Sequence, residues 1–180
     1  MIFSVVEEKS FLGYTIHRYE RLWNACVLKG VKKLMDDRTK DDLFYVCTLI
    51  EFTARKTKNH RKDIVQKLTK EEISHQLKVA CVNHCLSFEQ VSDEWIEDFG
   101  ITTGTFDTVA ECKYTVPSVT SIGRVYQQLI LSVMGEDVAQ TLIDVFSSFI
   151  SDEISDYNSN VYYSNPDYLR CSYQEGRLLA

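Results

Sequence analysis

The stretch DDLFYVCTLIEFTARKT, residues 41–57, decides the fold class of this chain. Its apolar positions recur at spacings of three and four residues: Leu43, Val46, Cys47, Ile50 and Ala54. That spacing is the period of an α-helix with one buried face. Asp41 and Asp42 begin the stretch and would lie in the first turn of the helix, where carboxylates suit the helix dipole. The stretch predicts an amphipathic helix that begins near Asp41.

Capping signals predict further helices on its C-terminal side. HRKDIVQKL, residues 60–68, reads as a short helix, and TKEE, residues 69–72, is a capping box that starts another. A second capping box, SFEQ at residues 87–90, opens a helix that Gly100 ends. Near the C-terminus, NPDYLRCSYQEG at residues 165–176 places Asn165 as N-cap, Pro166 at the first helical position and Gly176 after the last turn.

Residues 101–117 lose the helical period and are rich in threonine. They predict an irregular arm, with a short strand at CKYTV, residues 112–116. The helical period resumes after Pro117. Two apolar stripes carry it, and they comprise Ile122, Val125, Leu129 and Val133 in the first and Val138, Leu142, Val145 and Phe149 in the second.

These signals predict an all-α protein, a compact bundle of six to eight helices with one irregular arm near residues 101–117. Only two prolines and seven glycines occur among 180 residues, which favours helices. We expect a helical region over residues 1–100 and an acidic helical region over residues 118–180, packed as one unit. Ile16, Tyr19 and Trp23 are spaced for a helix near the N-terminus.

The composition indicates a soluble, non-secreted protein. The N-terminus MIFSVVEEKSF lacks the basic start of a signal peptide, and no apolar run approaches the roughly 20 residues that span a bilayer. The six cysteines lie in apolar helical stretches, so reduced thiols in a cytoplasmic compartment are expected. No membrane association is expected.

The octapeptide KVACVNHC, residues 78–85, concentrates the residue types that bind metals or act as nucleophiles. On a helix, His84 falls on one stripe with Ile73, Leu77 and Ala80, and Cys81 and Cys85 lie beside it. A structural zinc site needs four ligands, and no second pair is apparent. The pattern favours a core histidine with two packed thiols and no metal. A thiol or metal enzyme centred on this octapeptide stays open as an alternative.

Charge is unevenly distributed along the chain. Residues 29–78 carry 13 Lys and Arg against 8 Asp and Glu, whereas residues 79–113 carry 1 against 7 and residues 114–176 carry 2 against 8. The basic band is densest at RKTKNHRK, residues 55–62. A nucleic-acid-binding regulator could contact phosphates there. Its candidate residues are Arg55, Lys56, Lys58, Arg61 and Lys62.

The segment SDEISDYNSNVYYSNPDY, residues 151–168, combines carboxylates with tyrosines. Asp152 and Asp156 are four apart, which would place them on one helical face. Tyrosine gives a large contact area at low entropic cost and is enriched at interfaces. This segment is our candidate protein-binding surface, formed by Asp152, Glu153, Asp156, Tyr157, Tyr162, Tyr163 and Tyr168. Packing of these tyrosines onto the bundle is the open alternative.

The sequence contains none of the phosphate-loop, dinucleotide-binding, zinc-protease or nucleophile-elbow motifs. No catalytic residue and no cofactor is therefore assigned, and a non-enzymatic function is expected.

The stretches DDLFYVCTLIEFTARKTKNHRKDIVQKL, residues 41–68, and VNHCLSFEQVSDEWI, residues 82–96, resemble an uncharacterised family of small helical bacterial proteins from accessory or mobile-element loci. The matching features are the turn at Thr53–Thr57, the short helix at Ile64–Leu68, His84 and the helix Val91–Ile96. The resemblance covers residues 42–97 and implies no activity. It implies a small regulatory or binding protein.

The leading hypothesis is a protein-binding, regulatory module of a bacterial accessory locus. One specific form is an anti-CRISPR-like inhibitor whose acidic face competes for the basic groove of a nucleic-acid-handling machine. The partner would then be a protein with a basic groove, and nucleic acid is the alternative partner.

Overall fold

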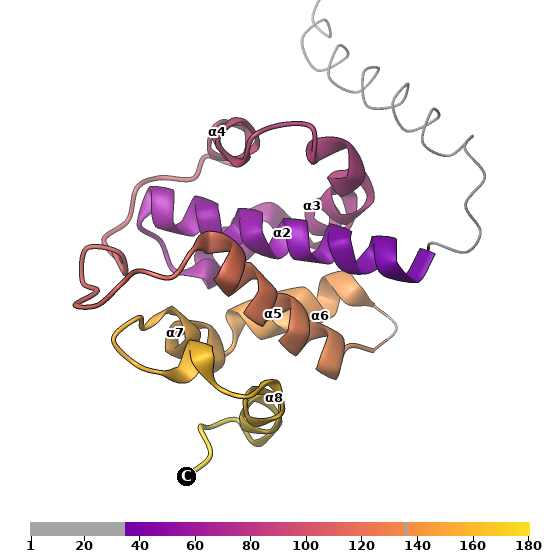
Figure 1. Ribbon diagram of the computed structural model, residues 1–180. Helices are drawn as coiled ribbons and strands as arrows, with labels where there is room; N and C mark the ends of the chain where they lie inside the picture. Colours follow the sequence, from indigo (N-terminus) through magenta and orange to yellow (C-terminus); the bar gives the residue numbers. More distant parts are fainter. Residues whose placement is uncertain (1–34, 136) are drawn as a thin grey trace, which may run out of the picture.

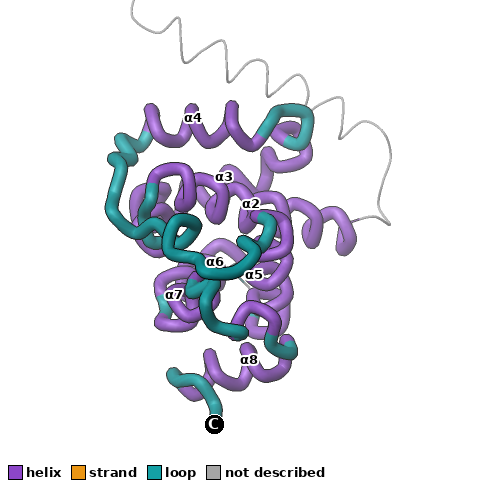
Figure 2. The backbone as a smooth tube through the Cα atoms, turned by 60° about the vertical axis from the view of Figure 1, so that its left-hand side comes forward, coloured by secondary structure: helices purple, strands orange, loops and turns teal. Residues whose placement is uncertain are grey.

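The computed structural model describes residues 35–135 and 137–180, and within them the all-α prediction is confirmed (Figures 1 and 2). The described residues form seven α-helices, one 3-10 helix and no strand. The elements are α2 (Met35–Thr57), α3 (Arg61–Asn83), α4 (Phe88–Asp98), α5 (Val119–Val133), α6 (Val138–Ser147), α7 (Phe149–Ser155), η1 (Val161–Tyr163) and α8 (Pro166–Glu175). The helix expected near Trp23 lies outside the described residues.

Helix α2 lies at the centre, with α3 beside it, α4 on one side and α5 on the other (Figure 1). Because neighbours surround it, nearly every residue from Leu43 to Ala54 is buried, not the single face that the periodicity predicts. The helix also begins at Met35, so Asp41 and Asp42 lie in its second turn and the prediction that it begins near Asp41 is wrong.

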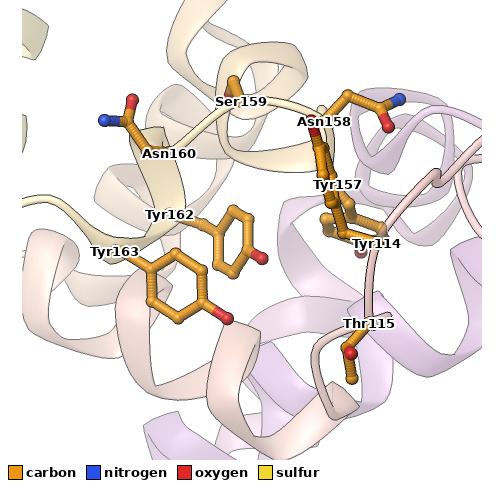
Figure 3. A pocket seen from close by; sticks show the side chains of 8 residues that line it. All are labelled: Tyr114, Thr115, Tyr157, Asn158, Ser159, Asn160, Tyr162 and Tyr163. Carbon is orange, nitrogen blue, oxygen red and sulfur yellow. The ribbon is translucent and has the colours of Figure 1, made fainter.

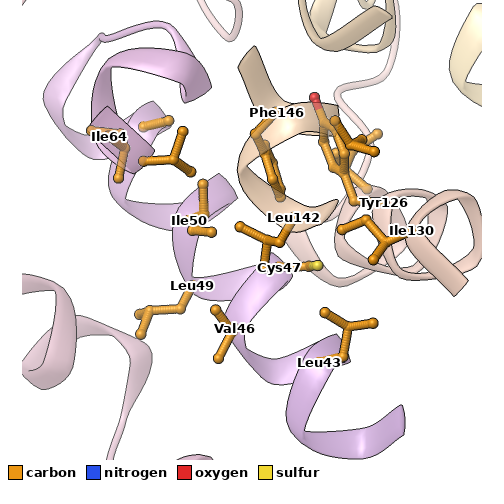
Figure 4. Packing of buried hydrophobic residues seen from close by; sticks show 14 of the residues in the cluster. Leu43, Val46, Cys47, Leu49, Ile50, Ile64, Tyr126, Ile130, Leu142 and Phe146 are labelled. Carbon is orange, nitrogen blue, oxygen red and sulfur yellow. The ribbon is translucent and has the colours of Figure 1, made fainter. Parts of the chain in front are cut away.

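One hydrophobic core joins the two halves of the chain. Side chains of α2 such as Leu43, Cys47 and Ile50 pack against Tyr126 of α5 and Phe146 of α6 (Figure 4). Within the predicted stripes of α5 and α6, Ile122, Leu129, Leu142 and Val145 are buried. The other members of those stripes, Val125, Val133, Val138 and Phe149, lie at the edge of the core. The second stripe is interrupted, because α6 ends at Ser147 and Phe149 begins α7.

The predicted capping signals act locally as expected. Thr69 interrupts α3 with φ 58° and ψ 166°, and its hydroxyl accepts a hydrogen bond from the amide of Glu72 at 3.5 Å. The two helices expected there therefore form one kinked element. The capping box of Ser87 is complete, and Gly100 adopts φ 57° after α4.

The last predicted helix also begins and ends where its sequence signals stand. The side chain of Asn165 caps α8 by accepting a hydrogen bond from the amide of Asp167. Gly176 ends the helix in the left-handed conformation, with φ 70°. These bounds confirm the prediction for residues 165–176.

Residues 101–117 form the predicted irregular arm, which runs between α4 and α5 over the turn between α2 and α3 (Figure 2). Backbone hydrogen bonds hold it there, from Gly104 to Thr57 and from Phe106 to Lys58, each at 2.8 Å. The strand predicted at residues 112–116 is wrong. A strand needs a neighbouring backbone, and here the amide of Lys113 bonds to a side chain instead, that of Asn158.

Candidate binding site

A buried ion-pair network forms around Glu51, in the middle of α2. The side chains of Glu51 and Arg61 are both 0% exposed. Arg61, the first residue of α3, donates from Nε to Oε2 at 2.8 Å and from Nη2 to Oε1 at 2.9 Å. Arg55, one turn further along α2, donates from Nε to Oε1 of Glu51 at 2.5 Å. One carboxylate therefore holds two guanidinium groups between α2 and α3.

Tyr157 connects this network to the C-terminal half. Its hydroxyl donates to Oε1 of Glu51 and accepts from Nε of Arg55 at 3.0 Å and from Nη2 of Arg61 at 2.9 Å. The arm joins as well, because Arg55 donates to the carbonyl of Pro117 at 2.8 Å and Arg61 to the hydroxyl of Thr108 at 3.3 Å. Four separate segments thus meet at one polar cluster.

The charges of the network stabilise one another. Burial alone would raise the pKa of Glu51, but the guanidinium groups of Arg61 and Arg55 outweigh it and lower this pKa to about 2. Burial alone would lower the pKa of Arg61, but the charge of Glu51 outweighs it and raises the pKa of Arg61 above the usual value. Burial, and then the charge of Glu51, raise the pKa of Tyr157. Glu51 is therefore ionised and Tyr157 keeps its proton near neutral pH.

The network is inaccessible, which limits its role. Glu51, Arg61 and Tyr157 are buried, and only a small part of Arg55 reaches the surface. Nη1 of Arg61 and Nη2 of Arg55 are buried and have no hydrogen-bond partner. A substrate could not reach these groups without displacing the arm. The arrangement serves to join segments of the fold, and it positions the ring of Tyr157.

That ring forms part of a surface pocket of about 570 Å³, between the arm and the segment that follows α7 (Figure 3). The pocket is lined by Tyr114, Thr115, Tyr157, Asn158, Ser159, Asn160, Tyr162 and Tyr163. We call it the tyrosine pocket. Figure 3 shows Tyr162 and Tyr163 on one side and Tyr114 and Tyr157 on the other.

The rings of the tyrosine pocket are both packed and exposed. Tyr157 and Tyr162 meet edge to face with centroids 5.8 Å apart, and Tyr162 and Tyr163 lie at 4.0 Å. Tyr114 and Tyr163 are 71% and 74% exposed. The side chain of Asn158 links the segment after α7 to the arm. Its Oδ1 accepts a hydrogen bond from the amide of Lys113 at 2.8 Å, and its Nδ2 donates to the carbonyl of Glu111 at 3.1 Å.

The structure divides the predicted protein-binding tyrosines into three groups. Tyr157 and Tyr162 are largely buried in the pocket wall, so only the pocket-facing part of each ring is available. Tyr163 is exposed, as a contact residue must be. Tyr168 lies apart, half-buried on α8, and donates to the carbonyl of Leu179 at 3.0 Å.

The predicted carboxylates do not form one acidic face. Asp152 pairs with Nδ1 of His60 at 2.8 Å and lies 3.9 Å from Nζ of Lys62, so it already has partners inside the chain. Glu153 is half-buried and Asp156 is exposed. Asp156 is the C-cap of α7, one turn beyond Asp152, since its amide donates to the carbonyl of Asp152 at 3.0 Å, but the two side chains differ in exposure and partners.

The predicted nucleic-acid-binding residues are engaged within the molecule. Arg55 and Arg61 point into the core, which corrects the expectation that they form an exposed basic surface. Each of the three lysines meets a carboxylate from a distant segment. The pairs are Lys56 with Asp93 at 2.7 Å, Lys58 with Asp107 at 3.0 Å and Lys62 with Asp152 at 3.9 Å. Folding brings the acidic half onto the basic band.

The octapeptide does not form a buried thiol and histidine face. His84 and Cys85 are exposed and Cys81 is half-buried, so the prediction of a core histidine is wrong. His84 directly follows Asn83, the last residue of α3, and keeps the helical position, since its amide donates to the carbonyl of Ala80 at 2.9 Å. At this end of the helix its ring lies at the surface, packed on the ring of Tyr45 with centroids 4.5 Å apart. Within residues 35–135 and 137–180, no three His, Cys, Asp or Glu side chains converge on a metal position.

Two residues of the site escaped sequence reasoning. Glu51 is a lone charge inside an apolar helix, and that isolation was the available signal that it is buried and paired. Tyr114 carried no such signal, because its segment is irregular and its position against Tyr157 depends on the fold.

Comparison with protein-family models, with curated proteins and with solved structures finds no match for this chain. The resemblance of residues 42–97 to bacterial accessory-locus proteins therefore stays a hypothesis. In the described part of the chain, every helix is too short or too polar to cross a membrane.

Proposed function

We propose that this chain is a non-enzymatic protein-binding module and that the tyrosine pocket contacts the partner. The observation that carries the proposal is that Tyr114 and Tyr163 line the same pocket. They are by far the most exposed large hydrophobic side chains of the described residues, and two distant segments bring them to one pocket. Exposed aromatic side chains gathered at a pocket are typical of interface anchors.

Charge around the pocket supports a protein partner with a basic surface. The two segments that border it, residues 109–118 and 151–168, contain five acidic residues and one lysine. Asp152 and Asp167 are paired within the chain, whereas Glu111, Glu153 and Asp156 form no ion pair with another described residue. Complementary charge would orient and accelerate the encounter with a basic groove. An inhibitor that occupies the groove of a nucleic-acid-handling protein is one specific form of this proposal.

The engaged lysines favour this function over direct nucleic-acid binding. Lys56, Lys58 and Lys62 each have a carboxylate within 4 Å, so contact with phosphates would require them to exchange partners. The tyrosine pocket requires no such exchange.

The test is affinity capture with the tagged full chain from a bacterial lysate, half of which is treated with nuclease, comparing wild type with Y114A/Y163A. The matched control is M134A, which removes a 43% exposed hydrophobic side chain elsewhere. We expect a discrete protein retained by wild type and by M134A and lost by Y114A/Y163A. The same captured protein with the pocket variant, or nucleic acid alone before nuclease treatment, would contradict the proposal.

A further inference from the structure

The lining of the tyrosine pocket has an unusual chemistry for a contact site. None of its eight residues is charged, and four of them are tyrosines. A phenol ring has a negative face and a positive edge, so several rings around one space attract a cation. An apolar side chain would also bury area there, but it would leave the polar groups of the lining without partners.

Two of those polar groups are available to hydrogen-bond a ligand. The amide of Asn160 and the hydroxyl of Thr115 make no hydrogen bond with any other described residue, and both residues are exposed. Asn158, by contrast, is committed to the arm. Asn160 and Thr115 can each offer an oxygen acceptor, and the tyrosine hydroxyls add more.

No carboxylate lines the pocket, and the acidic residues that stand close to its lining in sequence are exposed. Asp156 directly precedes Tyr157 and accepts from the amide of Asn158 at 3.0 Å, and the backbone carbonyl of Glu111 accepts from the side chain of Asn158. A cation entering the pocket is thus attracted without forming a fixed ion pair. Among protein cations the arginine side chain fits best, because its planar guanidinium stacks on rings, is weakly hydrated and carries five donors.

We propose that the tyrosine pocket recognises an arginine side chain of the partner protein. The guanidinium would stack on the exposed rings of Tyr114 and Tyr163 and donate to Thr115 and Asn160. The inference rests on the proposed function, since it names the chemical group by which that function selects its partner.

The test is an NMR titration of the full chain with its tyrosine rings labelled with ¹³C. The probes are N-acetyl-arginine methylamide, its neutral isostere N-acetyl-citrulline methylamide and the apolar N-acetyl-norleucine methylamide. We expect the arginine probe to shift the ring signals of Tyr114, Tyr162 and Tyr163, and to bind at least 5-fold more tightly than either other probe. Y163A should weaken arginine binding at least 5-fold, and M134A should leave it unchanged.

Each outcome separates this inference from the function on which it rests. Equal binding of citrulline or norleucine, or shifts that persist in Y163A, would overturn arginine recognition. If partner capture depends on Tyr114 and Tyr163 but the arginine probe fails, the binding module stands and this inference falls. If the probe binds and no protein is captured, the pocket chemistry holds and the proposed function fails.

Discussion

At the scale of single residues, Glu51 supplies the negative charge that balances the buried guanidinium groups of Arg55 and Arg61. Burying an ion pair costs desolvation energy, so the pair with Arg61 adds little net stability compared with apolar residues. Removing one partner is different, because it leaves the other charge buried and unpaired. The network therefore makes Glu51 indispensable to this particular packing.

We expect Glu51→Gln to lower the free energy of unfolding by about 3–5 kcal/mol, since two guanidinium groups lose their counter-charge. Urea denaturation measures the loss. The matched control is Glu153→Gln, because Glu153 is a half-buried carboxylate that makes no hydrogen bond with another described residue, and we expect a change within about 0.5 kcal/mol. Equal midpoints and slopes for the two variants would contradict the role of Glu51.

The lowered pKa of Glu51 predicts a pH dependence of stability. A carboxylate whose pKa falls from 4.5 to about 2 on folding contributes stability that is complete above pH 4.5 and is lost as pH falls toward 2. The contribution is about 3 kcal/mol at most. We expect the stability difference between wild type and E51Q, measured by urea denaturation, to shrink between pH 4.5 and 2. A difference that is constant over this range would show that Glu51 is not ionised in the folded protein.

At the scale of helices, α2 and α5 pack in close contact at Gly123. A Cβ atom added at Gly123 would lie 2.1 Å from Oγ1 and 2.9 Å from Cα of Thr48. The second distance involves backbone, so rotation of a side chain cannot relieve the contact. Glycine at position 123 is required by helix packing and not by its backbone dihedral angles.

Gly123→Ala should therefore force the two helices apart and lower the free energy of unfolding by about 1–3 kcal/mol. The control is Gly135→Ala, because a Cβ there meets nothing within 4 Å. Thermal unfolding followed by circular dichroism should show a fall of several degrees in Tm for G123A and little change for G135A. An unchanged or raised Tm for G123A would refute the close contact.

At the scale of the whole molecule, the acidic half neutralises the basic band. Asp93 of α4, Asp107 of the arm and Asp152 of α7 each reach a lysine of residues 56–62. These pairs are partly exposed, so each contributes little to stability. Their larger effect is on the surface potential, because each places a negative charge beside a lysine of residues 56–62.

Removing the three carboxylates should uncover that band. We expect D93N/D107N/D152N to bind a 20-base-pair DNA duplex at least 10-fold more tightly than wild type at low salt, as fluorescence anisotropy would show, with an affinity that falls as salt rises. The control E89Q/E97Q/E175Q makes the same change in net charge at exposed sites elsewhere. Equal gains for both variants, or tight DNA binding by wild type, would contradict the neutralisation.

Local signals were sufficient for the ends of α4 and α8 and for the helix start at Thr69. The capping box at Ser87, the bond of the Thr69 hydroxyl and the caps at Asn165 and Gly176 depend on hydrogen bonds between near neighbours in sequence, so the sequence alone predicts them. The same reasoning failed at the start of α2 and at His84. A helical projection gives the direction of a side chain on its helix but not whether another element covers it, and His84 lies exposed at the end of α3.

The sequence by itself determined that the described residues are all-α, where α4 and α8 begin and end, and that an irregular arm precedes α5, because periodicity and capping act over a few residues. Only the tertiary structure decided that Arg55 and Arg61 face inward to Glu51, that Lys56, Lys58 and Lys62 meet carboxylates, and that Tyr114 and Tyr163 line one pocket. These outcomes depend on contacts between residues far apart in the chain. The isolation of Glu51 in an apolar stretch indicates that it is paired, but spacing and composition do not say with which residues.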